Sequence, residues 1–173
     1  MDSEQGVRQQ AGTVGDNPVR LDAAKAESVV EALNLDFAAA LVLSQQFRKH
    51  AWSLDGRQFA HLSRFCRDAA DDLTLIVDDL ARRIRALGGV PVSSPAGAEH
   101  HSPIPFEGED IYGVERSLEN DLRACGDLIE QVSSHVELAQ GYGDHATAEL
   151  LRRHLLVLEE YARAIDRYLS TAD

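Results

Sequence analysis

The chain has 173 residues, of which 44% are hydrophobic and 27% are charged. That is ample for one domain with a real core and short for two. No stretch approaches about 20 uninterrupted apolar residues, and the N-terminal residues lack the basic and apolar regions of a signal peptide. We therefore expect a cytoplasmic protein with no membrane-spanning segment.

The formal charge is −12, aspartate outnumbers glutamate, and Lys25 and Lys49 are the only lysines. Such a bias is typical of a salt-adapted surface, because the Debye length falls to about 3 Å at 1 M salt and acidic side chains then repel one another less. The composition favours a halophilic source. An ordinary acidic cytosolic protein is the alternative.

Four long helices are predicted from apolar residues at helical spacing. Residues 1–21 mix glycine, proline and polar residues without such a period, so we expect a flexible N-terminal tail there and a bundle domain over residues 22–170. The first helix is predicted over residues 22–51 and is broken at Ser53-Leu54-Asp55-Gly56. The second ends at Gly88-Gly89. Its apolar stripe comprises Leu62, Cys66, Ala69, Leu73, Ile76, Leu80, Ile84 and Leu87.

A long connection separates the second helix from the third. Prolines at positions 91, 95, 103 and 105 are expected to interrupt any helix between residues 90 and 110. The third helix is predicted to begin at Ile111, and Asp144 is the expected N-cap of the fourth. Cys66 and Cys125 lie on apolar stripes, so we predict free buried thiols rather than a disulfide. Two helical hairpins joined by one crossover define an all-α, ferritin-like four-helix bundle, whereas an up-down-up-down bundle has three short loops.

Several segments carry a resemblance to a known family. They are Arg48-Lys49-His50-Ala51-Trp52-Ser53-Leu54-Asp55-Gly56 with Phe59 and Leu62, then Asp78-Asp79-Leu80-Ala81-Arg82-Arg83-Ile84-Arg85-Ala86-Leu87-Gly88-Gly89, and finally Ser117-Leu118-Glu119-Asn120-Asp121 with Gly143-Asp144-His145-Ala146-Thr147-Ala148. Together they resemble the Dps family of miniferritins, in particular its branch from salt-loving archaea, over about 150 residues from Leu21 onward. The resemblance implies a twelve-subunit hollow shell built from dimers. Such shells oxidise ferrous iron between paired subunits, store ferric mineral and often protect DNA.

The ferroxidase site that the resemblance implies uses two histidines of one subunit with an aspartate and a glutamate of its neighbour. Imidazole and carboxylate suit iron because they bind both of its oxidation states. On this chain the histidine positions fall on Ala51 and Ser63, the aspartate is Asp78, and the glutamate position is Arg82. Asp78 is thus the one residual metal ligand, and iron is a candidate rather than an assured cofactor.

Arg82 weakens the implied site further, because a guanidinium offers only hydrogen-bond donors and repels a cation. It lies one turn from Asp78, where an ion pair could occupy the place of the metal. We therefore interpret the ferroxidase centre as lost, with Arg82 replacing the metal charge. The alternative is that Arg82 points to solvent and the register differs here by one residue.

The remaining histidines provide no obvious substitute. His50 and His61 are rotated by about 100° and 200° around their helices from the expected ligand positions, so we interpret each as a solvated or core histidine. His100-His101 in the crossover could bind a transition metal weakly. No glutamate has a histidine three residues later, and Met1 is the only methionine, which disfavours a di-iron ferritin and a bacterioferritin-type haem.

Charge decides which partners are expected. The tail has no lysine before Lys25, its arginines are offset by acids, and a twelve-subunit shell multiplies the negative charge, so direct DNA binding is disfavoured. Acidic helix faces likewise disfavour membranes. Our hypothesis is a Dps-like, cage-forming homo-oligomer without an active ferroxidase centre, retained for structure, for protection or for co-assembly with an active Dps. The alternative is an iron-oxidising, iron-storing miniferritin that uses a non-standard metal site.

Overall fold

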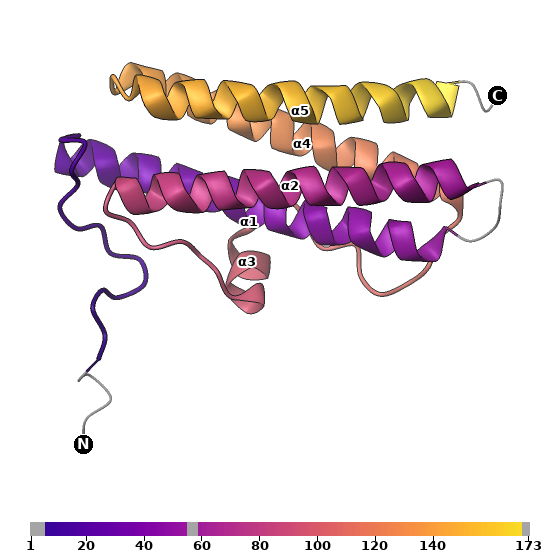
Figure 1. Cartoon of the computed structure of the whole chain (residues 1–173), viewed down its shortest axis with the longest axis horizontal. Helices are drawn as coiled ribbons and strands as arrows, with labels where there is room; N and C mark the ends of the chain where they lie inside the picture. Colours follow the sequence, from indigo (N-terminus) through magenta and orange to yellow (C-terminus); the bar gives the residue numbers. More distant parts are fainter. Residues whose placement is uncertain (1–5, 55–58, 171–173) are drawn as a thin grey trace.

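The computed structural model describes residues 6–54 and 59–170, and this part of the chain consists of helices and loops without a strand. A short helix, α3 (Pro95–His101), lies in the crossover. The bundle itself is formed by four long helices, α1 (Ala23–Ser53), α2 (Ala60–Ala86), α4 (Val114–Gly141) and α5 (His145–Ser170) (Figure 1). The predicted all-α bundle with its long crossover between the second and third long helices is therefore confirmed.

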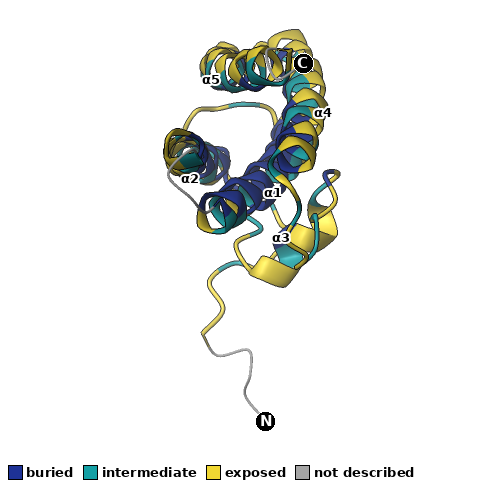
Figure 2. Cartoon of the chain, turned by 90° about the vertical axis from the view of Figure 1, so that its right-hand side faces the viewer, coloured by how far each residue is buried: buried dark blue, intermediate teal, exposed yellow. Residues whose placement is uncertain are grey.

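The bundle consists of two antiparallel hairpins, α1 with α2 and α4 with α5, which join where α1 packs on α4 (Figure 2). α2 and α5 meet much less extensively. Apolar side chains on the inner stripes fill the core, and burying one of them contributes about 1.5–3 kcal/mol. The fully buried ones include Leu33, Leu43, Phe47, Leu73, Leu80, Ile84, Leu118, Leu128, Leu151, Leu158 and Ile165.

Cys66 and Cys125 are free and buried in this core, as predicted. Burial, together with the charge of Asp121, raises the pKa of the Cys66 thiol to about 12. The same causes raise the pKa of Cys125. Neither thiol is therefore a thiolate at neutral pH, so neither is reactive.

The crossover contains a helix that its prolines were expected to exclude. α3 begins at Pro95, where a missing N–H costs nothing and the fixed φ of proline suits the first turn. Ser94 caps the helix, because its side chain accepts a hydrogen bond from the backbone N–H of Gly97 at 3.0 Å. Ala98 is buried where α3 packs on α1. The prediction was wrong because Pro95 is a first helical residue here and not an interior breaker.

The other helix ends follow the predicted signals with small shifts. α4 starts at Val114 rather than at Ile111, which is an exposed loop residue. Asp144 caps α5 as predicted, since its Oδ1 accepts a hydrogen bond from the backbone N–H of Thr147 at 3.0 Å. Arg83 of α2 donates to the same oxygen at 2.6 Å. Although burial acts to raise the pKa of Asp144, the bonds from Arg83 and Thr147 lower it. α1 ends at Ser53 with Leu54 as its C-cap, within the predicted break Ser53-Leu54-Asp55-Gly56, whose last two residues lie outside the described residues.

Gly88 ends α2 in the left-handed conformation, with a φ of 83°. The backbone N–H of Gly89 bonds back to the carbonyl of Ile84 at 2.9 Å, which satisfies one of the last carbonyls of the helix. The carbonyl of Gly88 accepts a hydrogen bond from the backbone N–H of Gly15 at 2.9 Å and one from the Gln9 side chain at 2.7 Å. The non-helical N-terminal segment is therefore attached to the end of α2 at this point, and the flexibility of the tail elsewhere stays a prediction.

We expect Gly88→Ala to lower the free energy of unfolding by about 2 kcal/mol, because positive φ strains an L-residue. A Cβ at this position would also collide with the carbonyl oxygen of Gly15. Gly126→Ala within α4 is the matched control, since its Cβ would meet nothing within 4 Å. That control should gain about 0.5–1 kcal/mol from better helix propensity. Urea unfolding at one protein concentration measures both, and similar losses in the two variants would contradict the role of Gly88.

Candidate metal centre

Ala51 and Ser63, at the two histidine positions of the implied ferroxidase site, lie next to each other. Ala51 is in the last turn of α1 and Ser63 is in the first turns of α2. The Ser63 hydroxyl donates a hydrogen bond to the carbonyl oxygen of Ala51 at 2.8 Å. A methyl group ligates nothing, and this hydroxyl is turned to the backbone. The structure thus brings the two positions together, but they present no imidazole.

Asp78 and Arg82 lie farther along α2 than Ser63. Fifteen residues separate Ser63 from Asp78 on this helix, which at 1.5 Å per residue is about 22 Å. No single chain can therefore bring all four positions to one ion. The two halves can meet only across two chains.

Arg82 pairs with two aspartates on the exposed face of α2. Its Nη1 lies 3.0 Å from Oδ1 of Asp79, and its Nη2 lies 3.9 Å from Oδ2 of Asp78. The expected pair with Asp78 is the longer contact, because Asp79 is also within reach at the i,i+3 spacing. The Arg82 side chain is 73% exposed, so water reduces its repulsion of a cation at 4 Å toward about 1 kcal/mol. In the single chain, the absence of the two histidines therefore weakens cation binding more than the charge of Arg82 does.

His50, the residue before Ala51, belongs to the core. It is 2% exposed, and both ring nitrogens face carboxylates. Nδ1 lies 2.8 Å from Oδ2 of Asp121 on α4, and Nε2 lies 2.8 Å from Oε2 of Glu107 in the crossover. With both carboxyls ionised, each ring nitrogen donates a proton, and the ring is then an imidazolium. Of the two interpretations of His50, solvated or core, the second is the right one.

Polar side chains around His50 complete a cluster that joins α1, the crossover and α4. The Lys49 ammonium lies 2.7 Å from Oε2 of Glu107, and the Asn120 amide donates to Oε1 at 2.6 Å. The Gln46 amide donates to Oδ1 of Asp121 at 2.8 Å. Every carboxylate oxygen thus has a donor, as buried charges require. We call this cluster the His50 clasp: Gln46, Lys49, His50, Glu107, Asn120 and Asp121.

The charge state of the clasp follows from competing effects. Burial acts to lower the pKa of His50, but hydrogen bonds and charges of Asp121 and Glu107 outweigh it and raise that pKa. Burial raises the pKa of Asp121 despite the bonds from His50 and Gln46. The contacts favour a charged His50, because a neutral ring would set a nitrogen lone pair against a carboxylate.

Sequence reasoning missed the two acidic members of the clasp. A signal existed for Asp121, which stands on the apolar stripe of α4 between Leu118 and Cys125, where an acid needs a buried partner. No comparable signal marked Glu107, which lies among the prolines of the crossover. Its pKa is lowered, because bonds from Lys49, Asn120 and His50 outweigh the opposing effect of burial.

The other histidines considered as ligands do not assemble into a site. His61 is exposed, and its ring centroid lies 6.1 Å from that of Tyr168. His100 and His101 are exposed on α3, and Nδ1 of His101 bonds to the carbonyl of Gly97 at 2.8 Å. Among residues 6–54 and 59–170, no three His, Cys, Asp or Glu side chains are already gathered to hold an ion.

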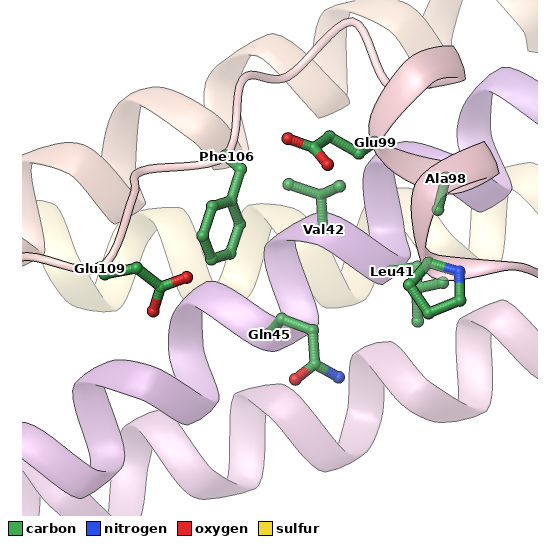
Figure 3. A pocket seen from close by; sticks show the side chains of 8 residues that line it. Leu41, Val42, Gln45, Ala98, Glu99, Phe106 and Glu109 are labelled. Carbon is green, nitrogen blue, oxygen red and sulfur yellow. The ribbon is translucent and has the colours of Figure 1, made fainter.

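A groove of about 520 Å³ lies between α1 and the crossover (Figure 3). Leu41 and Val42 of α1 contribute apolar side chains to its wall. In this view Phe106 lies between the carboxylates of Glu99 and Glu109, which therefore do not converge on one point. The groove is not arranged as a cation site.

The chain is similar to known proteins over nearly its whole length. A family model described as a ferritin-like domain matches residues 30–173. The DNA protection during starvation protein of Halobacterium salinarum is 42% identical over 98% of this chain and 93% of the relative. A nutrient stress-induced DNA-binding protein of Nostoc is 30% identical over 98% of this chain and 92% of the relative. The bundle with its crossover and the matching family model define a ferritin-like protein.

Similar solved structures narrow the class from ferritin-like proteins in general to one family. An archaeal Dps homologue from Halobacterium salinarum matches with a TM-score of 0.92 at 42% identity, covering 97% of this chain and 94% of that one. DpsC from Streptomyces coelicolor matches with a TM-score of 0.91 at 26% identity, covering 94% and 95%. The chain belongs to the Dps family, as its motifs predicted. Within the described residues, every helix is either too short or too polar to span a bilayer.

Proposed function

We propose that this chain is a cage-forming Dps protein whose inter-subunit ferroxidase centre is silent. The observation that carries the proposal is that Ala51 and Ser63 occupy both histidine positions. The Ser63 hydroxyl is already bonded to the carbonyl oxygen of Ala51 at 2.8 Å. Asp78 would be the one remaining ligand, and Arg82 lies 3.9 Å from it. One carboxylate beside a fixed positive charge is too small a ligand set for iron.

The proposed assembly is a dodecameric shell built from dimers. The separation of about 22 Å between Ser63 and Asp78 along α2 supports a site shared by two chains. Trp52 of α1 and Leu75 of α2 are 69% and 63% exposed, so the helices that carry these positions each leave a large apolar side chain open to a second chain.

Co-assembly with an active Dps would have a definite consequence. In a mixed pair, one site would combine Ala51 and Ser63 with the acids of the active chain. The other would combine the histidines of the active chain with Asp78 and Arg82. Neither set is complete, so we propose that silent subunits lower the ferroxidase activity of a shell while preserving its structure.

The relatives are named for protecting or binding DNA. For this chain we propose DNA protection without direct contact from the N-terminal segment. That segment has Arg8 and Arg20 but no lysine before Lys25, and the whole chain has a formal charge of −12. Phosphate binding gains its free energy from cationic side chains and counterion release. The same acidic composition supports our prediction of a salt-adapted source.

Ferrous oxidation tests the proposal. Assembled protein is mixed with Fe²⁺ without oxygen, then exposed to oxygen or peroxide, and the absorbance of ferric product is compared with a protein-free blank. We expect a rate equal to that of the blank. Rapid, saturable oxidation would overturn the proposal and favour the alternative, an iron-oxidising and iron-storing miniferritin with a non-standard site.

A further inference from the structure

Trp52 is the only tryptophan of the chain, and it is 69% exposed. It follows Ala51 directly and lies in the last turn of α1. The faces of an indole ring carry the negative potential of its π-system, and the last carbonyls of a helix add partial negative charge at the same end. This end of α1 therefore suits a flat cationic group.

Arg82 offers such a group on the exposed face of α2. Its Nη1 lies 3.0 Å from Oδ1 of Asp79, and its Nη2 lies 3.9 Å from Oδ2 of Asp78. The N–H bonds of a guanidinium lie in its plane, so the two aspartates hold Arg82 by its edge and leave its flat faces for stacking. Leu75, two turns earlier on the same side of α2, is also exposed. Arg82 can therefore stack on an aromatic ring without giving up either ion pair.

Trp52 and Arg82 cannot meet within one chain. The 2.8 Å hydrogen bond between Ser63 and Ala51 places the end of α1 beside the start of α2. Arg82 lies 19 residues beyond Ser63 on α2, which at 1.5 Å per residue is about 28 Å. A contact between this tryptophan and this guanidinium therefore requires a second chain.

We propose that Arg82 of one chain stacks on Trp52 of a second copy of the same chain, where Ala51 and Ser63 of one subunit face Asp78 and Arg82 of the other. The inference rests on the proposed function, which places these positions opposite one another, and it names the partner that the altered site selects. In a two-fold pair the same contact occurs twice. Arginine over tryptophan is a favourable cation–π pair.

The charges around the contact favour pairing of like chains. The two cations of the His50 clasp are matched by its two carboxylates, so the clasp does not repel an arriving guanidinium. A partner with glutamate in place of Arg82 would bring a carboxylate to the ring of Trp52 and no stacking cation. The arginine that disfavours iron thus becomes an adhesive contact between two silent subunits.

A double-mutant cycle on subunit dissociation tests the contact. Full-length wild type, Arg82→Gln, Trp52→Leu and the double variant are diluted in one buffer, with enough urea to dissociate the wild type partly, and sedimentation velocity measures association. Because the contact occurs twice, we expect each single change to raise the dissociation constant of the pair about fivefold to thirtyfold. The double variant should raise it no further than either single change. Effects that multiply, or no effect of either single change, would overturn the proposal.

Arg153→Gln is the matched control. Arg153 of α5 is 72% exposed against 73% for Arg82, and it forms an i,i+4 ion pair with Glu149 at 3.1 Å. Its effect and that of Trp52→Leu should multiply. Arg82→Gln also breaks the pairs on α2, but that loss is the same with or without Trp52 and cancels in the cycle. Coupling of Arg153 to Trp52 as strong as that of Arg82 would overturn the proposal.

Fluorescence gives a second measurement, since all tryptophan emission comes from Trp52. Acrylamide should quench assembled Arg82→Gln more efficiently than assembled wild type, because the ring loses its cover, whereas Arg153→Gln should be quenched like the wild type. Equal quenching in Arg82→Gln and wild type would overturn the proposal, even where Trp52→Leu fails to assemble. Neither measurement uses iron, so the rate of ferrous oxidation remains a separate test of the silent centre.

Discussion

Ala51→His, Ser63→His and Arg82→Glu together should give the assembled protein a ferrous oxidation activity that the wild type lacks. The three changes place two imidazoles and a second carboxylate with Asp78, which restores the full set of ligands that the Dps resemblance implies. We expect oxidation at least about tenfold faster than in the wild type, which corresponds to about 1.4 kcal/mol in activation free energy. Stopped-flow absorbance after mixing Fe²⁺-loaded protein with oxygen or peroxide measures the rate.

Splitting these changes between two chains tests whether the centre is shared. One chain carries Ala51→His and Ser63→His, and the other carries Arg82→Glu. Every copy of one parent lacks the same ligands, so a pair of identical chains cannot complete a site, and the separation of about 22 Å along α2 prevents one chain from supplying both halves. Co-expression should produce activity that each parent lacks. Activity of either parent alone, or none in the mixed shell together with none in the triple variant, would contradict the assignment of these positions.

The variant with both histidines but with Arg82 retained separates charge from ligand number. It offers three of the four ligands beside a guanidinium. If the arginine acts as the replacement for the metal charge, this variant should bind Fe²⁺ more weakly than the triple variant. Equal binding would mean that Arg82 points away from the ion, which is the alternative that the exposed side chain leaves open.

His50→Leu should lower the free energy of unfolding by about 3–5 kcal/mol, because it leaves buried carboxylates without their positive partner. Glu107 keeps Lys49 and Asn120, whereas Asp121 keeps only Gln46, so the loss falls mainly on Asp121. Denaturant unfolding at fixed protein concentration measures the effect. His61→Leu, on an exposed histidine, should stay within about 0.5 kcal/mol of the wild type. Similar losses of unfolding free energy in His50→Leu and His61→Leu would contradict a buried ion pair at His50.

The same clasp should make stability depend on pH in one direction. The pKa of His50 is raised in the folded state, so the folded protein holds a proton that the unfolded chain releases near pH 6.5. The contribution is complete below about pH 6.5 and is lost as pH rises through the folded pKa. His50→Leu should remove this slope and His61→Leu should keep it. An unchanged slope in His50→Leu would mean that His50 is neutral in the fold.

Local patterns in the amino-acid order were enough to predict the helices and several of their ends. The stripe from Leu62 to Leu87, the left-handed stop at Gly88 and the cap at Asp144 depend on residues within about a turn of one another, so they can be read without the fold. At Pro95 the local sequence was not enough to predict the structure. A proline breaks a helix from the inside but starts one at its first position, and the packing of Ala98 on α1 favours the second outcome.

The missing ligands at Ala51 and Ser63 were likewise visible in the sequence, because residue identity does not depend on the fold. Which polar side chains meet was decided by tertiary structure alone. His50 lies 57 residues from Glu107 and 71 from Asp121, yet both carboxylates reach its ring. His135 of α4 likewise lies 2.8 Å from Asp36 of α1, 99 residues away in the sequence. Periodicity gives the face of each helix, but the rotation of packed helices and the path of the crossover determine which faces touch.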